Sequence, residues 1–319
     1  MSRRFDAIVI GAGQAGPSLA IRLAGAGMSV AVIERNLFGG TCVNTGCTPT
    51  KTLIASAYAA HTARHAADYG VIIDAPPRVD MARAKARADA VVAQSRSGVE
   101  SWLRATERCK VITGHARFLA PDTVEVGEER LSAPRIFINV GGRALVPNLA
   151  GVDEVSFLTN STILKLDRVP EHLVIIGGSY VGLEFAQMYR RFGARVTVVE
   201  MGPRLIGRED EEVSQAIRDI LEGEGIAVRT GAECITLARH ADGIAVGVQC
   251  SEGDPKVIGS DVLLAVGRRP NTDDLGLDAV GVATDERGYI QVDEGVTTNV
   301  PGIWALGQCN GRGAFTHTA

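Results

Sequence analysis

The segment Phe5–Gly16, which reads FDAIVIGAGQAG, decides the fold of this chain. Its first half is a short apolar run, and three glycines then follow at the spacing GxGxxG: Gly11, Gly13 and Gly16. Helical spacing of apolar residues continues from Ser18 to Ala26, and a second apolar run ends on the acidic Glu34. This order predicts a β-α-β unit that binds a dinucleotide, because the glycines let a phosphate approach the backbone and the acid accepts hydrogen bonds from a ribose.

The same pattern recurs about halfway along the chain. The apolar run Leu173–Ile176 leads into a turn that carries Gly177, Ser179 and Gly182, and a helix through Arg191 is followed by a strand ending on Glu200. A single glycine motif is weak evidence, since such turns also serve packing alone, but two copies that both end in an acid favour two nucleotide sites. Glu200 would repel a 2′-phosphate, so we expect the second site to prefer NADH, with NADPH as the alternative if Arg204 offsets that charge.

Composition places the chain among globular proteins of ordinary make-up. It has 319 residues, 45% hydrophobic and 22% charged, with a net charge of -4, which suits two or three domains and no disordered class. Lys and Arg form no block, so no nucleic-acid partner is expected. Apolar runs stay below the roughly 20 residues that a bilayer span needs, and no signal-like segment opens the chain. We therefore expect no membrane association and a cytoplasmic location.

The segments between and after the two units complete the predicted architecture. Alternating charges and alanines predict a long exposed helix over 80–109, strands are expected over 111–140, and residues 147–151 supply turn residues at a boundary. A further strand over 261–271 ends in a glycine turn at Gly267. The predicted fold class is α/β, with two Rossmann-like three-layer dinucleotide-binding domains: residues 1–150 and 268–319 form the first, and residues 151–267 form the second, which is inserted into it.

Two of the six cysteines form a local pair, Cys42 and Cys47, in the run GGTCVNTGCTPTK over 39–51. On a regular helix, residues five apart point about 140° apart, so a disulfide needs the distorted turn that Gly46 supplies. The helix that follows is expected to reach about Tyr69, and its dipole together with Lys51 favours a thiolate at Cys47. Two unreactive packing cysteines are the alternative interpretation. The remaining cysteines are expected to be buried apolar side chains: Cys109, Cys234, Cys250 and Cys309.

Taken together, these motifs resemble the class I pyridine nucleotide-disulfide oxidoreductases, a family that includes dihydrolipoamide dehydrogenase, glutathione reductase and mercuric reductase. The resemblance covers essentially the whole chain and rests on GAGQAG, GGTCVNTGCTPTK, GGSYVGLE, VGRRPN and IWALGQCNG in that order; the cysteine run and the closing GAFTHT are most similar to the mercuric-reductase-like branch. It implies FAD as a cofactor, bound by Gly11, Gly13, Gly16, Glu34, Arg35, Gly40, Thr41, Lys51, Gly141 and Gln308. It also implies NADH or NADPH, bound by Gly177, Ser179, Gly182, Glu200 and Gly267.

The resemblance also implies catalytic roles. Cys42 would be the thiol that attacks the substrate, and Cys47 would face the flavin and form a charge-transfer complex with it. Lys51 would pair with Glu184 beside the flavin, although Glu184 could instead be only a partner of the helix dipole. Electrons would pass from NAD(P)H through FAD to a Cys42–Cys47 disulfide, and then to a small-molecule disulfide or similar acceptor.

Two departures from the family pattern qualify these expectations. Gln308 stands where the family has an aspartate, which puts tight FAD binding in doubt. Residue Ala319 ends the sequence in or near a helix expected after Gly313, so the family's C-terminal dimerisation domain, with its acid-base histidine, is expected to be absent. A monomer or weak dimer with slow turnover follows. The alternatives are a non-catalytic nucleotide-binding remnant and a dithiol-independent NADH oxidase or quinone reductase. No metal site is expected, since His61 and His65 resemble a solvated or core pair.

Overall fold

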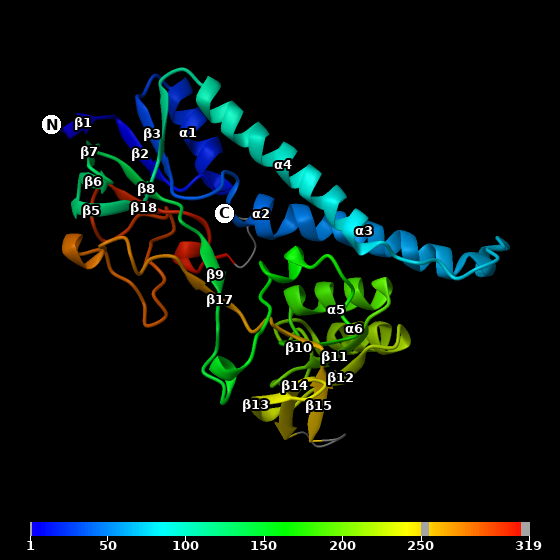
Figure 1. Cartoon of the computed structure of the whole chain (residues 1–319). Helices are drawn as coiled ribbons and strands as arrows, with labels where there is room; N and C mark the ends of the chain where they lie inside the picture. The colour runs from blue at the N-terminus through cyan, green and yellow to red at the C-terminus, as the bar shows by residue number, and fades with distance from the viewer. Residues whose placement is uncertain (1, 250–254, 314–319) are drawn as a thin grey trace. The chain divides into compact units, whose positions relative to one another are not determined.

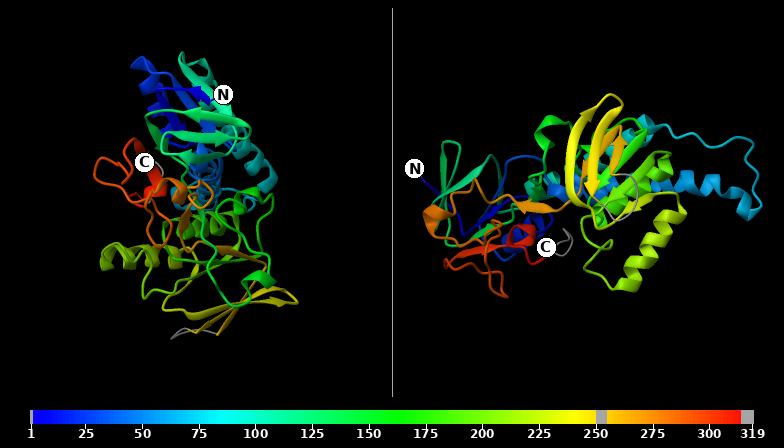
Figure 2. Two further views of the ribbon diagram at one scale, coloured as in Figure 1. Left: turned by 90° about the vertical axis from the view of Figure 1, so that its left-hand side faces the viewer. Right: turned by 90° about the horizontal axis from the view of Figure 1, so that it is seen from below.

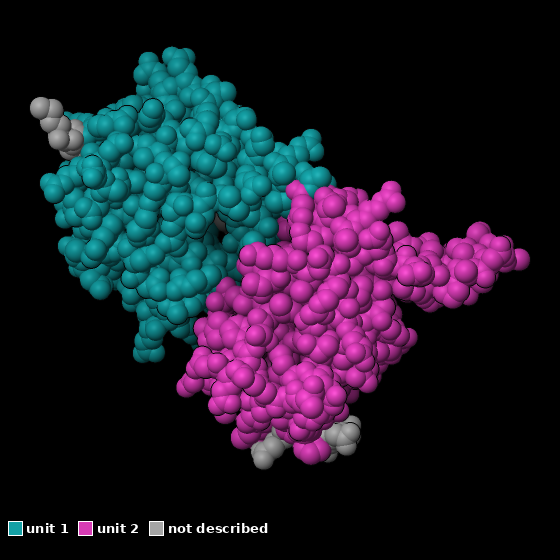
Figure 3. Space-filling view, viewed as in Figure 1, with its two compact units in different colours: residues 1–48, 90–143, 268–319 teal, residues 49–89, 144–267 magenta. Residues whose placement is uncertain are grey.

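The computed structural model describes residues 2–249 and 255–313. The chain divides into two compact units, coloured separately in Figure 3. Unit 1 comprises Met1–Thr48, Ala90–Arg143 and Arg268–Ala319, and unit 2 comprises Pro49–Asp89 and Ala144–Gly267. The predicted nucleotide domains stay predictions, because compactness alone does not identify a ligand. Across the described ranges, no helix is long and apolar enough to cross a bilayer.

Unit 1 is built on a five-stranded parallel sheet with the strand order β18-β8-β2-β3-β4. Its strands are β2 (Ala7–Ile10), β3 (Val30–Glu34), β4 (Cys109–Thr113), β8 (Ile136–Ile138) and β18 (Ile303–Ala305). A four-stranded sheet contains β1 (Ser2–Arg4), β5 (Ala116–Ala120), β6 (Thr123–Val126) and β7 (Glu129–Ser132). The helices of this part are α1 (Ala15–Gly25), α2 (Gly40–Thr45) and η5 (Gly307–Asn310), with η4 at Asp278–Val280. In chain order the central strands run 3-2-1-4-5, the order of a dinucleotide-binding sheet.

Alternate residues of β2 face two different hydrophobic layers, which explains why the strand is apolar throughout. Ile8 and Ile10 pack into a cluster with residues of β5 and β6, whereas Ala7 and Val9 pack with residues of α1 and with Leu103 of α4 (Met81–Ala105). Figure 1 shows α1 and the small green sheet at different sides of the parallel strands. Unit 1 is therefore a three-layer structure of helices, parallel sheet and a second sheet.

Unit 2 repeats this arrangement on a four-stranded parallel sheet with the order β12-β11-β10-β16. Its strands are β10 (His172–Ile176), β11 (Arg195–Val199), β12 (Ala227–Arg229) and β16 (Asp261–Leu264). One face carries α5 (Tyr180–Phe192) and α6 (Glu211–Gly223), and the other carries an antiparallel sheet of β13 (Glu233–His240), β14 (Gly243–Gln249) and β15 (Lys256–Gly259). Leu173 and Ile175 face the helices, while Val174 and Ile176 face the antiparallel sheet, which is yellow in Figure 2.

The predicted fold class is confirmed, because both units are three-layer and Rossmann-like. The boundary between the units falls within two helices, α3 (Cys47–Arg64) and α4 (Met81–Ala105). The helix expected to reach Tyr69 ends at Arg64, and a 3-10 turn, η1 (Ala66–Tyr69), completes it. The strand expected over 261–271 is split, since β16 ends at Leu264 and a separate β17 (Arg268–Pro270) pairs with β9 (Gly142–Ala144). Two further 3-10 turns are η2 (Val152–Glu154) and η3 (Ile163–Lys165).

One expectation about the cysteines is wrong. Cys309 is fully buried and Cys109 is half-buried, but Cys234 is exposed. It has a positive φ of 49° and lies on the exposed face of β13, whose other face buries Ile235 and Leu237. Cys250, His317 and the helix expected after Gly313 lie outside the described residues.

Candidate functional site

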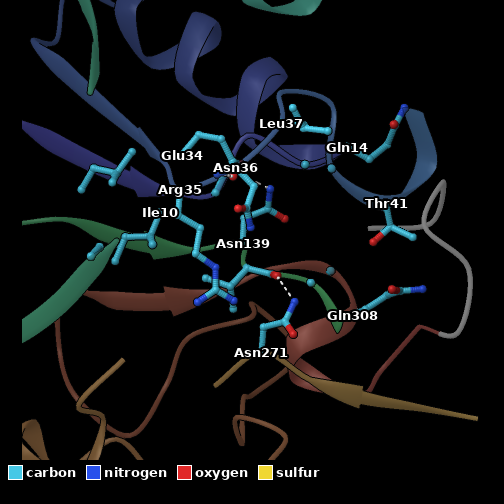
Figure 4. Close-up of a pocket in the computed structure, with 18 of the residues that line it drawn as sticks. Ile10, Gln14, Glu34, Arg35, Asn36, Leu37, Thr41, Asn139, Asn271 and Gln308 are labelled. Atoms are coloured by element: carbon cyan, nitrogen blue, oxygen red, sulfur yellow. Dashed lines mark hydrogen bonds between the residues drawn. The ribbon is translucent and has the colours of Figure 1, made fainter. Parts of the chain in front are cut away.

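Unit 1 contains a pocket of about 290 Å³ at the carboxyl ends of its parallel strands. Segments that follow β2, β3, β8 and β18 all contribute to it, as expected for the ligand crevice of an open α/β sheet. Figure 4 shows Thr41 and Gln308 on the side of the pocket away from Ile10. The pocket lining contains most of the residues predicted to hold FAD: Gly11, Gly13, Glu34, Arg35, Gly40, Thr41, Gly141 and Gln308. Cys42 lines it as well.

The first glycine turn depends on the absence of side chains. A Cβ at Gly11 would lie 2.3 Å from the carbonyl oxygen of Asn139, and the φ of Gly11 is +103°. Gly16 does not line the pocket; a Cβ there would lie 2.2 Å from the Gly11 oxygen, so this glycine lets α1 pack against the turn. A Cβ at Gly40 would lie 2.7 Å from the Cα of Gly13, which brings two glycine backbones together at the pocket. This bare backbone next to the start of α1 fits a ligand phosphate.

The acid that ends each second strand is bound to its own glycine turn. Glu34 is buried and accepts hydrogen bonds from the N–H groups of Ala12 and Asn36, both at 2.8 Å. In unit 2, Glu200 accepts from the N–H groups of Gly178 and Gly202, at 2.6 and 2.7 Å. The two carboxylates therefore fix the loops around them in the same way. Contact of either acid with a ribose stays a prediction.

Two asparagines of the pocket were missed by the sequence reasoning. Asn139, directly after β8, donates to the Gly11 oxygen at 3.3 Å. Asn271 donates from its side chain to the Val140 oxygen and from its backbone to the Gly141 oxygen, both at 3.0 Å, and the first bond is drawn in Figure 4. Asn271 belongs to the VGRRPN motif, which was used as a family signature without a role for this side chain. No sequence pattern marked Asn139.

The cysteine pair lies at a break between two helices. Helix α2 ends at Thr45, Gly46 has φ -140° and ψ -119°, and α3 begins at Cys47, so the distorted turn that the sequence predicted is present. A Cβ at Gly46 would lie 2.9 Å from the Thr41 oxygen, which explains why this position has no side chain. Cys42 and Cys47 are half-buried thiols. Disulfide formation between them stays a prediction.

Lys51 and Glu184 form an ion pair within unit 2. Lys51 lies in α3, one turn after Cys47, and Glu184 lies in α5. The first turn of α5 contains no acidic residue. The interaction of the helix dipole with Glu184 is therefore weak. Their predicted pairing is thus observed, while their placement beside a flavin is not tested. The buried residues Leu53 and Ala57 of α3 pack with residues of α5 in one hydrophobic cluster, which brings the two helices together.

The second glycine turn, in unit 2, has the same construction as the first. Gly177 has φ +115°, and a Cβ there would lie 2.4 Å from the Ala265 oxygen. Ser179 precedes α5 as its N-cap residue, and a Cβ at Gly182 would lie 2.1 Å from the Gly177 oxygen. Gly267 follows β16 with φ +137°. Arg204, weighed as a partner for a 2′-phosphate, donates to the carbonyl oxygens of Gly207 and Glu209 at 3.3 and 3.1 Å.

His61 lies in α3, and His65 directly follows the end of that helix. The rings of His61 and His65 are tilted by 35° with their centroids 4.2 Å apart, and Nδ1 of His65 lies 2.9 Å from the His61 oxygen. Burial, followed by the charge of Arg191, lowers the pKa of His61. Within residues 2–249 and 255–313, no group of three or more His, Cys, Asp or Glu side chains is placed to hold a metal ion.

The fold and the pocket define a class of protein: an α/β protein with two Rossmann-like units, the first of which has a pocket lined by bare glycine backbone and by Cys42. The model of the family "Pyridine nucleotide-disulphide oxidoreductase" matches residues 5–319, and the chain belongs to this family. FAD and NAD(P)H are the cofactors of the family, and the bare glycine backbone and strand-end acids of both units fit two such nucleotides.

Similar proteins support this assignment along nearly the whole chain. A mercuric reductase of Streptomyces lividans is 38% identical over 320 residues, covering 99% of this chain and 67% of that protein. A dihydrolipoyl dehydrogenase of Thermus scotoductus is 34% identical and also covers 99% of this chain, and 68% of its own length is matched. The Cu(II) complex of the HOCl-induced flavoprotein disulfide reductase RclA from Escherichia coli superposes with a TM-score of 0.87 at 32% identity, covering 99% of this chain and 68% of that one. The chain thus spans about two thirds of the length of these relatives.

Proposed function

We propose that the chain passes electrons from NAD(P)H, through FAD held in unit 1, to the Cys42–Cys47 pair, and from the pair to a disulfide or similar acceptor. The chemistry that FAD supplies when bound is two-electron transfer between a nicotinamide and the cysteine pair. The observation that carries the proposal is the position of Cys42, which lines the pocket that also contains Glu34 and Gly13. Gly11, Gly13, Thr41 and Gln308 are the residues proposed to hold FAD.

The cysteines supply the thiol chemistry. The Cys42 thiolate attacks one sulfur of a disulfide substrate, a mixed disulfide forms, and the first substrate thiolate leaves. The Cys47 thiolate then attacks Sγ of Cys42, which releases the second substrate thiolate and leaves a Cys42–Cys47 disulfide. Protons from water neutralise the released thiolates, and two electrons from NAD(P)H restore the pair. The break at Gly46 supports this exchange, because it frees Cys47 from the regular helix that would point the two thiols apart.

The reduction of the cysteine pair by NADH can be measured directly. The native chain, supplied with FAD, should be yellow and should gain one pair of titratable thiols after anaerobic addition of NADH. Cys42→Ser should abolish that gain, while Cys234→Ser, at an exposed position on β13, should leave it unchanged. Protein that cannot take up FAD would sink the proposal. Reduction of FAD without new thiols would favour the nucleotide-binding remnant, and NADH oxidation that survives in Cys42→Ser would favour the dithiol-independent oxidase.

The acceptor is proposed to be a disulfide or a thiophilic metal ion. A mercuric reductase and a reductase solved with Cu(II) are among the similar proteins, and soft thiolate ligands suit such ions. NADH-dependent turnover measured separately with lipoamide, glutathione disulfide, Hg(II) and Cu(II) would rank these acceptors. Turnover above background with a disulfide, and none with Hg(II) or Cu(II), would exclude a metal ion as the acceptor.

Unit 2 is proposed to bind NADH in preference to NADPH. Glu200 ends β11 as a carboxylate that would repel a 2′-phosphate. Arg204 is the nearby cation that could neutralise such a phosphate, but its guanidinium already donates to two loop carbonyls. Titration of the chain with each nucleotide tests this, and equal or tighter binding of NADPH would contradict it.

A further inference from the structure

The two glycine turns of the chain make equivalent backbone hydrogen bonds, but the side chains at one pair of equivalent positions differ. Gly11 donates to the Ile33 oxygen at 2.7 Å, as Gly177 donates to the Val199 oxygen at 2.8 Å. In both units the strand before the turn pairs with a second strand, β8 in unit 1 and β16 in unit 2. The residue directly after that second strand donates to the last residue of the strand before the turn: Asn139 to Ile10 and Ala265 to Ile176, both at 2.8 Å. Asn139 of unit 1 and Ala265 of unit 2 are therefore equivalent positions with different side chains.

In unit 1 the Asn139 side chain lies against the whole glycine turn. Its Nδ2 donates to the Gly11 oxygen at 3.3 Å. The same atom is 2.8 Å from the position that a Cβ would take at Gly16, and 3.4 Å from that position at Gly13. Asn139 is only 6% exposed, and Figure 4 shows it among the residues of the pocket. The amide group thus occupies room that Gly13 and Gly16 leave empty, while the backbone oxygen of Asn139 is the atom nearest to the Cβ position of Gly11.

Unit 2 has the opposite combination of side chains. Ala265 replaces the asparagine, and Ser179 takes the place of Gly13 in the turn. The Cβ of Ala265 lies 3.4 Å from the position that a Cβ would take at Gly182, so it makes only ordinary contact there. A large amide is thus combined with Gly13 in unit 1, and a methyl group is combined with Ser179 in unit 2.

We propose that Asn139 is a positioning residue that holds the first glycine turn in the shape that accepts the phosphates of FAD. The inference rests on the proposed binding of FAD in unit 1. The bond to the Gly11 oxygen fixes the carbonyl side of the turn, so that the N–H groups at the start of α1 stay directed toward the pocket. Asn271 fixes the backbone next to Asn139, because it donates hydrogen bonds to the carbonyl oxygens of Val140 and Gly141.

The test compares FAD retention in variants of the full holoprotein. Release of FAD on dilution, followed by the recovery of flavin fluorescence, should give a dissociation constant about five- to tenfold higher in Asn139→Ala, the effect of one lost hydrogen bond. Asn139→Asp keeps the size of the side chain but replaces the donor with a second oxygen facing the Gly11 carbonyl, so its loss should be at least as large. Asn299→Ala is the matched control: this exposed asparagine also donates to a backbone carbonyl, that of Gly281, outside the pocket.

A double-mutant cycle separates positioning from general stability. Gly13→Ser alone should weaken FAD binding, because its hydroxyl meets the Asn139 amide, and Gly13→Ser with Asn139→Ala should bind more tightly than the product of the single effects predicts. Melting temperatures without FAD should match between Asn139→Ala and Asn299→Ala, while the rise in melting temperature on adding FAD should be smaller for Asn139→Ala.

These experiments distinguish failure of the Asn139 proposal from failure of the proposed function. Absence of FAD binding in the native chain would remove the proposed function itself. Native binding combined with unchanged retention in both Asn139→Ala and Asn139→Asp would overturn only the role of Asn139. An equal loss in Asn299→Ala, or additive effects in the cycle, would also overturn it. If Asn139→Ala does not fold, the size-matched Asn139→Asp decides the question.

Discussion

Lys51 of α3 and Glu184 of α5 form an ion pair between two helices of unit 2, with 59% and 41% of their side chains exposed. Pairs as exposed as this contribute roughly 0 to 1 kcal/mol to stability. Stability therefore gives little reason for the pair. Its position gives the other candidate reason, because the pair holds the Lys51 cation one helical turn after Cys47, the cysteine predicted to face the flavin.

Glu184→Gln should separate these two roles. We expect the free energy of unfolding to change by less than about 1 kcal/mol, while the rate of NADH-driven thiol formation falls about tenfold, the effect of some 1.4 kcal/mol of lost electrostatic stabilisation. Urea unfolding and rapid thiol titration measure the two quantities. Glu222→Gln breaks a pair with Arg218 on α6 of the same unit and should leave the rate unchanged. A Glu184→Gln variant that reacts at the native rate would limit the pair to a structural contact.

Gly46→Ala should disturb the cysteine pair. The new Cβ would lie 2.9 Å from the Thr41 oxygen and 3.3 Å from the Cα of Cys42, so the segment carrying Cys42 must shift. At a fixed ratio of reduced to oxidised glutathione, we expect a smaller fraction of Cys42–Cys47 disulfide than in the native chain, together with a loss of about 1 to 3 kcal/mol in stability. Gly98→Ala is the control, because that glycine of α4 has no atom within 4 Å of the new Cβ and should gain up to about 1 kcal/mol. An unchanged disulfide fraction in Gly46→Ala would show that the turn tolerates a side chain.

Glu200→Gln should reduce the preference for NADH. The amide keeps one acceptor oxygen but places an NH₂ group against the N–H of Gly178 or Gly202, so NADH binding should weaken, by about tenfold for a lost charged hydrogen bond. NADPH binding should weaken less, because the repulsion of the 2′-phosphate is also removed. Nucleotide fluorescence titrations give both constants, and Glu212→Gln in the first turn of α6 serves as a charge-matched control. A ratio of the two constants that stays at its native value would count against Glu200 as the selecting group.

Stability should fall as the solution becomes acidic, and His172 should account for part of the loss. His172 is 6% exposed; its Nδ1–H donates to the Ile258 oxygen at 2.7 Å, and its Nε2 lies 2.9 Å from the Thr197 hydroxyl, which can donate to a neutral ring. Burial, and then the charge of Arg195, lowers its pKa below the ordinary 6.5. Below that pH the unfolded chain gains a proton that the folded chain does not, so the free energy of unfolding decreases as the pH falls through 6.5 toward the lowered pKa.

Urea unfolding at several pH values between about 8 and 5 measures this effect. His172→Gln keeps a donor for the Ile258 oxygen and should show a weaker loss on acidification than the native chain, even if it is less stable at pH 8. His240→Gln, at the end of β13, is the control and should follow the native pH dependence. Parallel pH curves for His172→Gln and the native chain would assign the acid sensitivity to other groups.

The sequence predicted the parts of the fold that depend on local patterning. The runs at 7–10 and 173–176 are apolar at every position, so they identify strands buried on both faces, and the glycines and terminal acids identify the turns between them. The break at Gly46 was also predictable, since regular helix geometry cannot bring Cys42 and Cys47 together. Each of these features is carried by residues close together in the sequence.

Features that depend on distant residues were not predictable in this way. Asn139 lies 128 positions from Gly11 along the chain and meets it only because β8 and β2 are neighbours in the sheet. The grouping of Pro49–Asp89 with unit 2 likewise follows from the packing of α3 on α5, not from any boundary signal.

The bonds between each strand-end acid and its own glycine turn have a consequence for the thermodynamics of binding. Because Glu34 holds Ala12 and Asn36, and Glu200 holds Gly178 and Gly202, both turns reach their final shape when the protein folds. The entropy lost in ordering these loops is then part of the free energy of folding and does not reduce the free energy of ligand binding. Each β-α-β segment therefore acts as a preorganised cassette whose conformation should change little between the empty and the loaded state.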